Sequence, residues 1–517
     1  MVSRRAAIAA AVAVPAGVLL GAPALVGLLR KAPRRVTGGF VDDGSAVGHA
    51  LRDGTRPAAP ARRERVPIVI LGGGVSGLGA AWALAREGLR DFVVLESARE
   101  AGGNARSGEM EGMRHPWGAH YLPVPDARNT LVRELCTDIG LLRDGVWDER
   151  ALAFAPQERL FQHGTWHEGI EPSFALTRAE RDELTRFDAT MAEWRARDAF
   201  AVPSVECAAR TAREWRALDR QTMGEWLTAQ GYRTPALRWL VDYGVRDDYG
   251  ASLETASAWA GVHYFAGRPA HDAGPLTWPE GNAWLIARLL ERVGPRVRTN
   301  APVWRVGREG ARWTIDTADI RYEADAVIAA MPVHALARVL DGVSPAPVTL
   351  DRSPWLVANV LLDRWPEERG LPVAWDNVIY DSPSLGYVVA THQSLRTEQA
   401  RSVWTWYHAP VERDAASARR WLRDLSWGEA RDLVLNDLRR AHPDIDGCVA
   451  RVDVLRYGHA MPRPTPGFLD ATAALRAWQP GPRFALAHTD ASGLSLFEEA
   501  LERGVSAARQ VREALRA

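Results

Sequence analysis

Three glycines and one glutamate stand at a characteristic spacing between positions 72 and 96. Gly72, Gly74 and Gly77 follow an apolar run over residues 66–71, and Glu96 comes nineteen residues after Gly77. The first glycine permits a tight turn, the second lets the backbone approach a pyrophosphate, and the third lets a helix pack closely on a strand. An acid at this distance accepts a hydrogen bond from a ribose hydroxyl. The spacing therefore predicts a dinucleotide site, in which we include Ser76 of the same turn.

These residues need a strand, a turn and a helix to hold them in place. Residues 66–71 have the length of a buried strand, and apolar residues then recur at helical spacing as far as Glu87, after which Gly88 ends the pattern. A second apolar run over residues 92–95 leads directly to Glu96. A glycine motif alone is weak evidence, but this strand, helix and second strand supply the context that the motif requires.

Length and composition exclude several classes of protein. A chain of 517 residues is longer than one ordinary core, so two domains are expected. Lys plus Arg and Asp plus Glu both total 64, so no charge excess indicates nucleic-acid binding. The three cysteines are far apart and predict neither a metal site nor disulfides. Lys31 is the only lysine in the chain.

The N-terminal segment has the features of an export signal. Arg4 and Arg5 precede twenty-four residues without a charge, positions 6–29, and the pattern resembles a twin-arginine signal. The alternative is an uncleaved membrane anchor, since the apolar stretch is long enough to span a bilayer. We expect residues 1–30 to be signal or anchor, which places the protein in the periplasm or envelope. Residues 31–65 are expected to be a linker with an ordered patch near residues 38–41.

A second glycine-bearing loop, with Gly102, Gly103 and Arg106, follows Glu96. Taken with residues 72–96, this loop resembles the flavin-containing amine oxidase superfamily, which includes phytoene desaturases and protoporphyrinogen oxidases. The resemblance implies FAD as the cofactor and a phosphate contact from Arg106. It also implies that the isoalloxazine ring passes Gly118 and Ala119.

Two later segments extend the resemblance. Residues 300–306 resemble the strand whose valine, here Val303, meets the adenine through backbone groups. Residues 484–487 read as a strand that leads through Asp490, Gly493 and Leu494 into an amphipathic helix. In the superfamily the acid at the position of Asp490 binds the ribityl-phosphate portion of FAD. His488 replaces the usual glycine.

We predict an α/β fold with a discontinuous Rossmann-type FAD-binding domain and an inserted α+β substrate domain. The FAD-binding domain is expected to comprise residues 66–125, 275–345 and 467–517, and the substrate domain residues 126–274 and 346–466. The first substrate portion is helical and charged, whereas the second contains short β-rich runs typical of antiparallel strands.

One of these β-rich runs places Trp404, Trp406 and His408 on a single face of a strand. One interpretation is sheet core beneath a helix over residues 415–442. The other is that some of these tryptophans, with Trp375 and Tyr407, form the apolar roof of a pocket above the flavin.

The predicted function is an FAD-dependent oxidoreductase that removes a hydride from a C–H bond of a small organic substrate. Members of the superfamily that oxidise amines usually place a lysine near flavin N5, and Lys31 is the only lysine available. Because this lysine lies at position 31, before the dinucleotide motif, the sequence favours desaturase, dehydrogenase or isomerase chemistry over an ordinary oxygen-using amine oxidase. A flavin-binding scaffold without turnover is the alternative from another class, and an NAD-binding protein is disfavoured by the segment around Asp490.

Three histidines stand in segments that resemble flavin-facing ones: His120, His459 and His488. Because histidine titrates near neutral pH, these side chains are candidates for proton transfer near N5. The alternative for each is a hydrogen-bonded structural histidine. Substrate, electron acceptor and covalent attachment of FAD are left open by the sequence.

Overall fold

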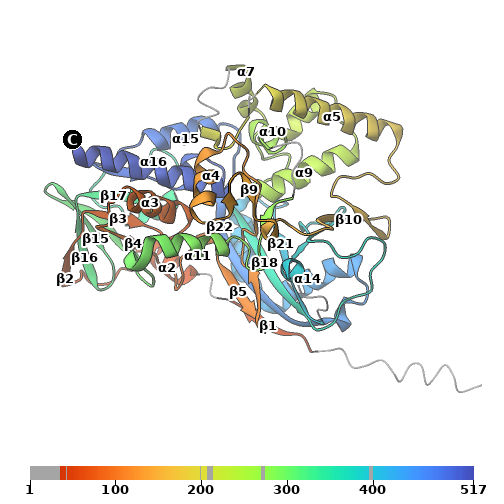
Figure 1. The fold of residues 1–517 in the computed structure, drawn as a ribbon, viewed down its shortest axis with the longest axis horizontal. Helices are drawn as coiled ribbons and strands as arrows, with labels where there is room; N and C mark the ends of the chain where they lie inside the picture. The colour runs from red at the N-terminus through yellow and green to blue at the C-terminus, as the bar shows by residue number, and fades with distance from the viewer. Residues whose placement is uncertain (1–34, 42–43, 198–199, 206–212, 269–273, 395–399) are drawn as a thin grey trace, which may run out of the picture.

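Three groups of elements make up the part of the chain that the structure describes. The computed structural model describes residues 35–41, 44–197, 200–205, 213–268, 274–394 and 400–517. A parallel sheet with its helices lies at the left of Figure 1, a large mixed sheet at the lower right, and a helical cluster at the upper right. Segments distant in sequence meet in each group.

The first group is built on a parallel sheet of five strands in the order β13–β4–β3–β17–β23. The strands are β13 (Val297–Arg298), β4 (Phe92–Leu95), β3 (Ile68–Leu71), β17 (Ala326–Ala329) and β23 (Phe484–Leu486). They come from three separate stretches of chain, so the predicted discontinuous α/β fold is confirmed. β3, β4 and β17 are buried along their whole length, because both faces of the sheet are covered.

Alternate residues of β3 belong to two different cores, as the two-residue period of a strand requires. Ile68 and Ile70 pack in a core with α3 (Val75–Arg86), α11 (Ala283–Val293) and α16 (Phe497–Arg516). Val69 and Leu71 face a second sheet on the opposite side. That sheet has the order β14 (Arg305–Glu309), β15 (Arg312–Asp316), β16 (Ile320–Ala324) and β2 (Arg62–Arg65), and α12 (Val333–Val339) packs beside it.

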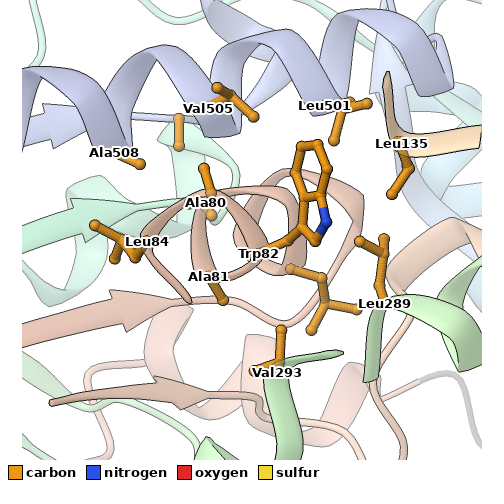
Figure 2. Close-up of a cluster of buried hydrophobic side chains, with 14 of the residues drawn as sticks. Ala80, Ala81, Trp82, Leu84, Leu135, Leu289, Val293, Leu501, Val505 and Ala508 are labelled. Carbon is orange, nitrogen blue, oxygen red and sulfur yellow. The ribbon is translucent and has the colours of Figure 1, made fainter. Parts of the chain in front are cut away.

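Trp82 fills the space between the helices of the first core. Figure 2 shows its ring among Leu135 of α4 (Thr130–Asp138), Leu289 of α11 and Leu501 of α16. The indole N–H donates to Asp138 Oδ2 at 3.0 Å, so the buried ring keeps a hydrogen bond. This side chain joins three helices that lie far apart in sequence.

Two glycines allow α3 to approach other backbone segments closely. A Cβ at Gly77 would lie 1.9 Å from the backbone oxygen of Gly72, and a Cβ at Gly504 of α16 would lie 2.1 Å from that of Ser76. No side chain fits at such distances. The close packing predicted for Gly77 is therefore observed, and it fixes the first turn of α3 against both the sheet and α16.

The second group is a sheet of eight strands. Their order is β1 (Thr37–Phe40), β22 (Val449–Pro462), β18 (Arg352–Leu362), β21 (Ser402–His408), β20 (Tyr387–Val389), β19 (Asp376–Ile379), β10 (Glu158–Gln162) and β11 (Thr165–Glu168). Neighbours are antiparallel except for the β1–β22 and β10–β19 pairs, which are parallel. The helices α13 (Ala415–Asp424) and α14 (Trp427–Ala441) contribute to the core on one face.

The aromatic residues of this sheet divide between its two faces. Trp404 and Trp406 are buried in the core with α14, and the Trp406 N–H donates to Asp437 of that helix at 2.8 Å. For these two residues the interpretation as sheet core is confirmed. Trp375 and Tyr407 belong to the opposite core, which borders the cavities described below.

The third group is a cluster of helices around an aromatic core. Its elements are α5 (Arg178–Ala196), α7 (Arg213–Arg216), α8 (Met223–Ala229), α9 (Pro235–Tyr249), α10 (Ala258–Ala266) and α15 (Phe468–Ala477). Phe187, Trp226 and Trp259 are buried at its centre. Thr177 and Thr222 begin α5 and α8 with capping boxes, which satisfy the first N–H groups of each helix.

The described part of the predicted linker, residues 31–65, contains regular elements: β1, α2 (Ser45–Arg52) and β2. The expected ordered patch near residues 38–41 coincides with β1. Backbone pairing of β2 with β16 orders its charged residues, and Arg63 forms ion pairs with Glu309 and Glu323. Composition could not reveal a partner so distant in sequence.

The expected signal or anchor at residues 1–30 lies outside the described residues. Within the described ranges, no helix combines the length and apolar character that crossing a membrane requires. The domain boundaries given above remain predictions.

Candidate active site

The turn between β3 and α3 presents backbone N–H groups to a cavity. Gly72 has φ 107°, a conformation that favours glycine. The N-cap of α3 is Gly74, which offers no side chain to cap the helix. The first N–H groups of α3 are therefore suited to an anionic ligand, which the positive end of the helix also attracts.

Glu96 follows β4 and lies beside this turn. One carboxylate oxygen accepts a hydrogen bond from the Gly73 N–H at 2.8 Å, and the other accepts one from the Ala98 N–H at 2.8 Å. These bonds hold the carboxylate at the glycine turn. The Ser97 hydroxyl donates to the same oxygen as the Ala98 N–H, at 3.2 Å. Because a carboxylate has about four acceptor sites, one remains for a ribose hydroxyl.

A cavity with about 1190 Å³ of empty volume extends along this turn, and we call it the cofactor cavity. Several distant segments meet in its lining. The predicted residues that line it are Gly72, Gly74, Ser76, Glu96, Gly102, Gly103, Ala119, Val303, His459 and His488. The structure thus brings together most of the residues that the sequence predicted for the cofactor.

Four other predicted residues have different places. Gly77 serves the close packing of α3, and Gly118 lines the neighbouring cavity described below. Gly493 has φ 79°, and a Cβ there would meet the ring of Phe468 at 2.6 Å. Leu494 is buried in the core of the helical cluster. These residues shape the surroundings of the cofactor cavity without lining it.

Arg106, which the resemblance assigned to phosphate, also lies outside the lining of the cofactor cavity. Its Nε donates to the backbone oxygen of Gly103 at 3.1 Å. The side chain therefore contacts the second glycine loop through its backbone. The arginine that lines the cavity is Arg352, which the sequence analysis missed.

Arg352 and Asp490 form a buried ion pair at the cofactor cavity. Their exposed fractions are 4% and 2%. Nη1 of Arg352 donates to Asp490 Oδ1, Nη2 donates to the backbone oxygen of His459 at 3.3 Å, and Asp490 Oδ2 accepts from the Val333 N–H at 2.7 Å. Burial alone would raise the pKa of Asp490, but Arg352, His488 and the Val333 N–H outweigh it and hold that pKa well below its usual range.

The Asp490 carboxylate is bound by protein partners and positions Arg352 at the cofactor cavity. Its predicted contact with the cofactor remains a prediction. Arg352 begins β18 without any motif around it. One arginine among many carries no signal that sequence reasoning can use.

The cofactor cavity has features that fit a dinucleotide. Oδ1 of Asn282 is buried and has no hydrogen-bond partner in the described part of the chain, although its Nδ2 donates to the Tyr121 carbonyl at 2.8 Å. This lone acceptor suits an N–H of a bound ring system. A Cβ at Gly103 would lie 3.4 Å from the Cα of Gly74, so the two glycine loops form a narrow cradle. Arg352 and the N-terminus of α3 supply positive potential for phosphates.

A second cavity, with about 910 Å³ of empty volume, adjoins the first, and we call it the substrate chamber. Residues that line both are Asn104, Ala119, Asn282, Ala460, Ser495, Leu496 and Phe497. A third cavity of about 960 Å³ shares His120, Asp247, Arg268 and Tyr407 with the chamber and extends it toward Tyr243 and Trp375. The chamber therefore connects the cofactor cavity to this extension.

Carboxyl groups outnumber cationic side chains in the described walls of the chamber and its extension. The carboxyls are Glu158, Asp247, Asp248, Asp376 and Glu498. Arg268 contacts the Asp248 carboxylate at 2.7 Å. Burial raises the pKa of Asp247 to about 7, helped by the nearby Asp248, and raises that of Glu498 to about 7. Burial also raises the pKa of Asp376 well above its usual range.

The three candidate histidines lie in different places. His120 lines the substrate chamber and lies 5.0 Å, between ring centroids, from Tyr407. Burial lowers its pKa to about 4. His459 lines the cofactor cavity, stacks on His334 at 4.5 Å, and has a pKa lowered to about 4, chiefly by burial. His488 accepts from the Asp490 N–H at 3.0 Å. Their roles in proton transfer remain predictions.

The parallel sheet, the glycine turn and the cofactor cavity define a dinucleotide-binding fold. Comparison with known families is more specific: the profile described as flavin containing amine oxidoreductase matches residues 75–512. The chain belongs to this family, which implies FAD as its cofactor.

Curated relatives share part of the sequence. A Mycobacterium tuberculosis protein named as flavin-containing monoamine oxidase AofH is 27% identical over 327 residues, which is 59% of this chain and 63% of the relative. The chain thus spans less than two thirds of that relative. The bovine peroxisomal N(1)-acetyl-spermine/spermidine oxidase is 39% identical over 101 residues, 19% of each chain.

Solved structures show the same fold. Putrescine oxidase with bound putrescine superimposes with a TM-score of 0.67 at 19% identity, over 87% of this chain and all of that one. Cyclohexylamine oxidase from Brevibacterium oxydans gives a TM-score of 0.63 at 17% identity, over 87% of this chain and all of that one. At these identities the likeness establishes the fold alone.

Proposed function

We propose that the protein is an amine dehydrogenase, which removes a hydride from the carbon next to a substrate nitrogen. Bound FAD supplies the two-electron acceptor for this step. The single observation that carries the proposal is the excess of carboxyl groups over cationic side chains in the substrate chamber and its extension.

The raised pKa values explain how such a chamber would select a cation. Without a ligand, burial disfavours the charged forms of Asp247 and Glu498 and raises their pKa to about 7. An ammonium group nearby favours the carboxylate forms, because opposite charges attract strongly where water is excluded. A neutral polyene offers no such compensation. A fatty-acid carboxylate would meet repulsion, since Arg268 is already paired with Asp248.

Aromatic faces supply the remaining recognition. Trp355, Tyr407 and Tyr457 line the chamber, and Trp375 lines its extension. Burial raises the pKa of Tyr407 well above its usual range, so this phenol stays neutral. Such rings attract a cation over their faces and pack against the apolar part of an amine. Two fold neighbours carry names of amine oxidases, which is consistent with this substrate class.

We propose a dehydrogenase and not an oxidase because of where the one lysine lies in the chain. Lys31 is the only lysine in the chain and precedes the FAD-binding motif by about forty residues. The lysine that the superfamily usually places near N5 is therefore lacking from the chain beyond that point. We infer that reduced FAD passes its electrons to an acceptor other than oxygen. We further propose that the reaction occurs in the cell envelope, because Arg4 and Arg5 precede an apolar segment.

Anaerobic reduction of the FAD-loaded protein tests the proposal. The panel should contain primary and secondary amines, alcohols of the same carbon skeletons, polyenes and fatty acids. We expect only amines to bleach the flavin, and we expect the reduced protein to react faster with a quinone or dye than with oxygen. Bleaching by a polyene and not by amines would overturn the substrate class. A flavin that no compound reduces would favour the scaffold alternative.

A further inference from the structure

Glu498 occupies the border between the cofactor cavity and the substrate chamber. It is the second residue of α16 and lines the chamber, while the preceding Leu496 and Phe497 line both cavities. Its exposed fraction is 7%, so the carboxyl group is almost completely removed from bulk water. The side chain is thus placed beside the site where substrate must meet the cofactor.

The Glu498 carboxyl has no ion-pair or hydrogen-bond partner among the other described side chains, and the hydrogen bond it makes is to its own backbone N–H. The charged groups that face it are Arg268, Asp248 and Glu499. Arg268 is committed to Asp248, and Glu499 accepts a hydrogen bond from the Ser204 N–H. On α4, Cys136 also faces it, and burial raises the pKa of that thiol to about 12, which keeps it neutral. A buried, unpaired carboxyl of this kind is costly unless it serves a ligand.

We propose that Glu498 is a catalytic residue that accepts a proton from the substrate ammonium before hydride transfer. This inference rests on the proposed function, since it requires an amine substrate. Transfer of one N–H proton to the carboxylate leaves a nitrogen lone pair and a neutral carboxylic acid. Departure of the hydride, with both electrons of the C–H bond, then leaves an iminium ion on the substrate, for which FAD is the two-electron acceptor.

Proton affinity distinguishes Glu498 from the other groups in the chamber. Its pKa is raised to about 7, chiefly by burial, with Glu499 and Asp248 adding to the rise and Arg268 opposing it. A base of this strength accepts protons near neutral pH. Burial lowers the pKa of His120 to about 4, so its imidazole is a much weaker acceptor. Asp247 has a similar pKa but lines the chamber and its extension, whereas Glu498 directly follows Leu496 and Phe497, which line the cofactor cavity.

The first test is the pH dependence of flavin reduction by a primary alkylamine under anaerobic conditions. We expect Glu498→Gln to slow reduction roughly a hundredfold near pH 7, the low end for general acid–base catalysis. The reduction rate of this variant should then rise with pH until the alkylammonium ion in solution is fully deprotonated, instead of following the titration of a carboxyl group. Glu498→Asp should recover part of the rate. As a matched comparison, Asp247→Asn should weaken amine binding and keep the pH profile of the parent.

The second test needs no turnover. Tetramethylammonium carries no proton to donate, so its binding to the FAD-loaded protein should ionise Glu498 and Asp247 and reduce the infrared carbonyl band of their protonated forms. The band change should be smaller in Glu498→Gln than in the parent and should be lost in the Glu498→Gln, Asp247→Asn double variant. A band change in Glu498→Gln as large as in the parent, or equal reduction rates of parent and Glu498→Gln at every pH, would overturn the role of Glu498 alone. Amines that leave the parent flavin oxidised would contradict the proposed function itself.

Discussion

The ion pair between Arg352 and Asp490 is expected to stabilise the fold and hold the cofactor cavity in shape. Replacing Asp490 with Asn should lower the free energy of unfolding by about 3–5 kcal/mol, because Arg352 would stay buried without a countercharge. The exposed fractions of 4% and 2% limit how far water can replace the lost partner. The Val333 N–H would also lose a charged acceptor.

Urea unfolding of the FAD-free protein measures this cost. The series consists of Asp490→Asn, Arg352→Leu and the double variant. Because the two side chains contact each other, the double variant should lose less stability than the sum of the single variants. Arg352→Leu should in addition weaken FAD binding, since the guanidinium lines the cofactor cavity. The reasoning would be refuted if the free energy of unfolding of Asp490→Asn lay within about 1 kcal/mol of that of the parent. Strictly additive losses in the double variant would refute it as well.

The same pair fixes the sign of a pH dependence. The pKa of Asp490 lies below its usual range in the folded protein, so the unfolded chain binds a proton more readily. The stabilisation is therefore complete above the ordinary carboxyl pKa of about 4 and declines only as the pH falls below it. The difference between parent and Asp490→Asn should be equal at pH 7 and pH 5 and should shrink in stronger acid.

Three other changes test separate parts of the account. Glu96→Ala should weaken FAD binding by roughly 1.5–3 kcal/mol, the loss of a hydrogen bond to a charged group, as measured by equilibrium dialysis. Unchanged affinity would mean that Glu96 serves only its protein donors, the Gly73 and Ala98 N–H groups and the Ser97 hydroxyl. Replacing Arg4 and Arg5 together by Lys should retain the protein in the cytoplasm of an export-competent host, because the twin-arginine route reads that pair; continued export would indicate another route or a plain anchor. His120→Ala should slow flavin reduction less than about tenfold and leave its pH profile unchanged, since the pKa of His120 is lowered to about 4. A loss of about a hundredfold would instead indicate that His120 transfers the proton.

Sequence reasoning succeeded where the determinants are local. Gly72, Gly74 and Glu96 belong to one unit of strand, turn, helix and second strand. The residues that this unit requires lie close together in the sequence. The alternating pattern of β21 predicted which residues share a face, although only the structure shows that α14 covers Trp404 and Trp406. The dinucleotide-binding unit followed from such local signals, and the resemblance to the superfamily then implied FAD.

The chemistry of the substrate chamber depends on contacts between distant segments. Glu498 is one acid in a charged helix, and Asp247 lies within an acidic pair of α9, so neither position stands out in sequence. The role of Arg352 depends on its ion pair with Asp490, which lies 138 residues away in the sequence. The strands β2 and β10 were missed for the same reason, because each pairs in parallel with a strand hundreds of residues later in the chain.

A single anaerobic turnover tests the central claim most directly. FAD-loaded protein is reduced by a saturating primary alkylamine in the absence of any acceptor, and the products are quantified. The account predicts that the aldehyde formed by hydrolysis of the iminium ion appears in an amount equal to the FAD reduced, with ammonia released in step. Reduced FAD accompanied by a product that keeps its amine and gains a carbon–carbon double bond would contradict the account.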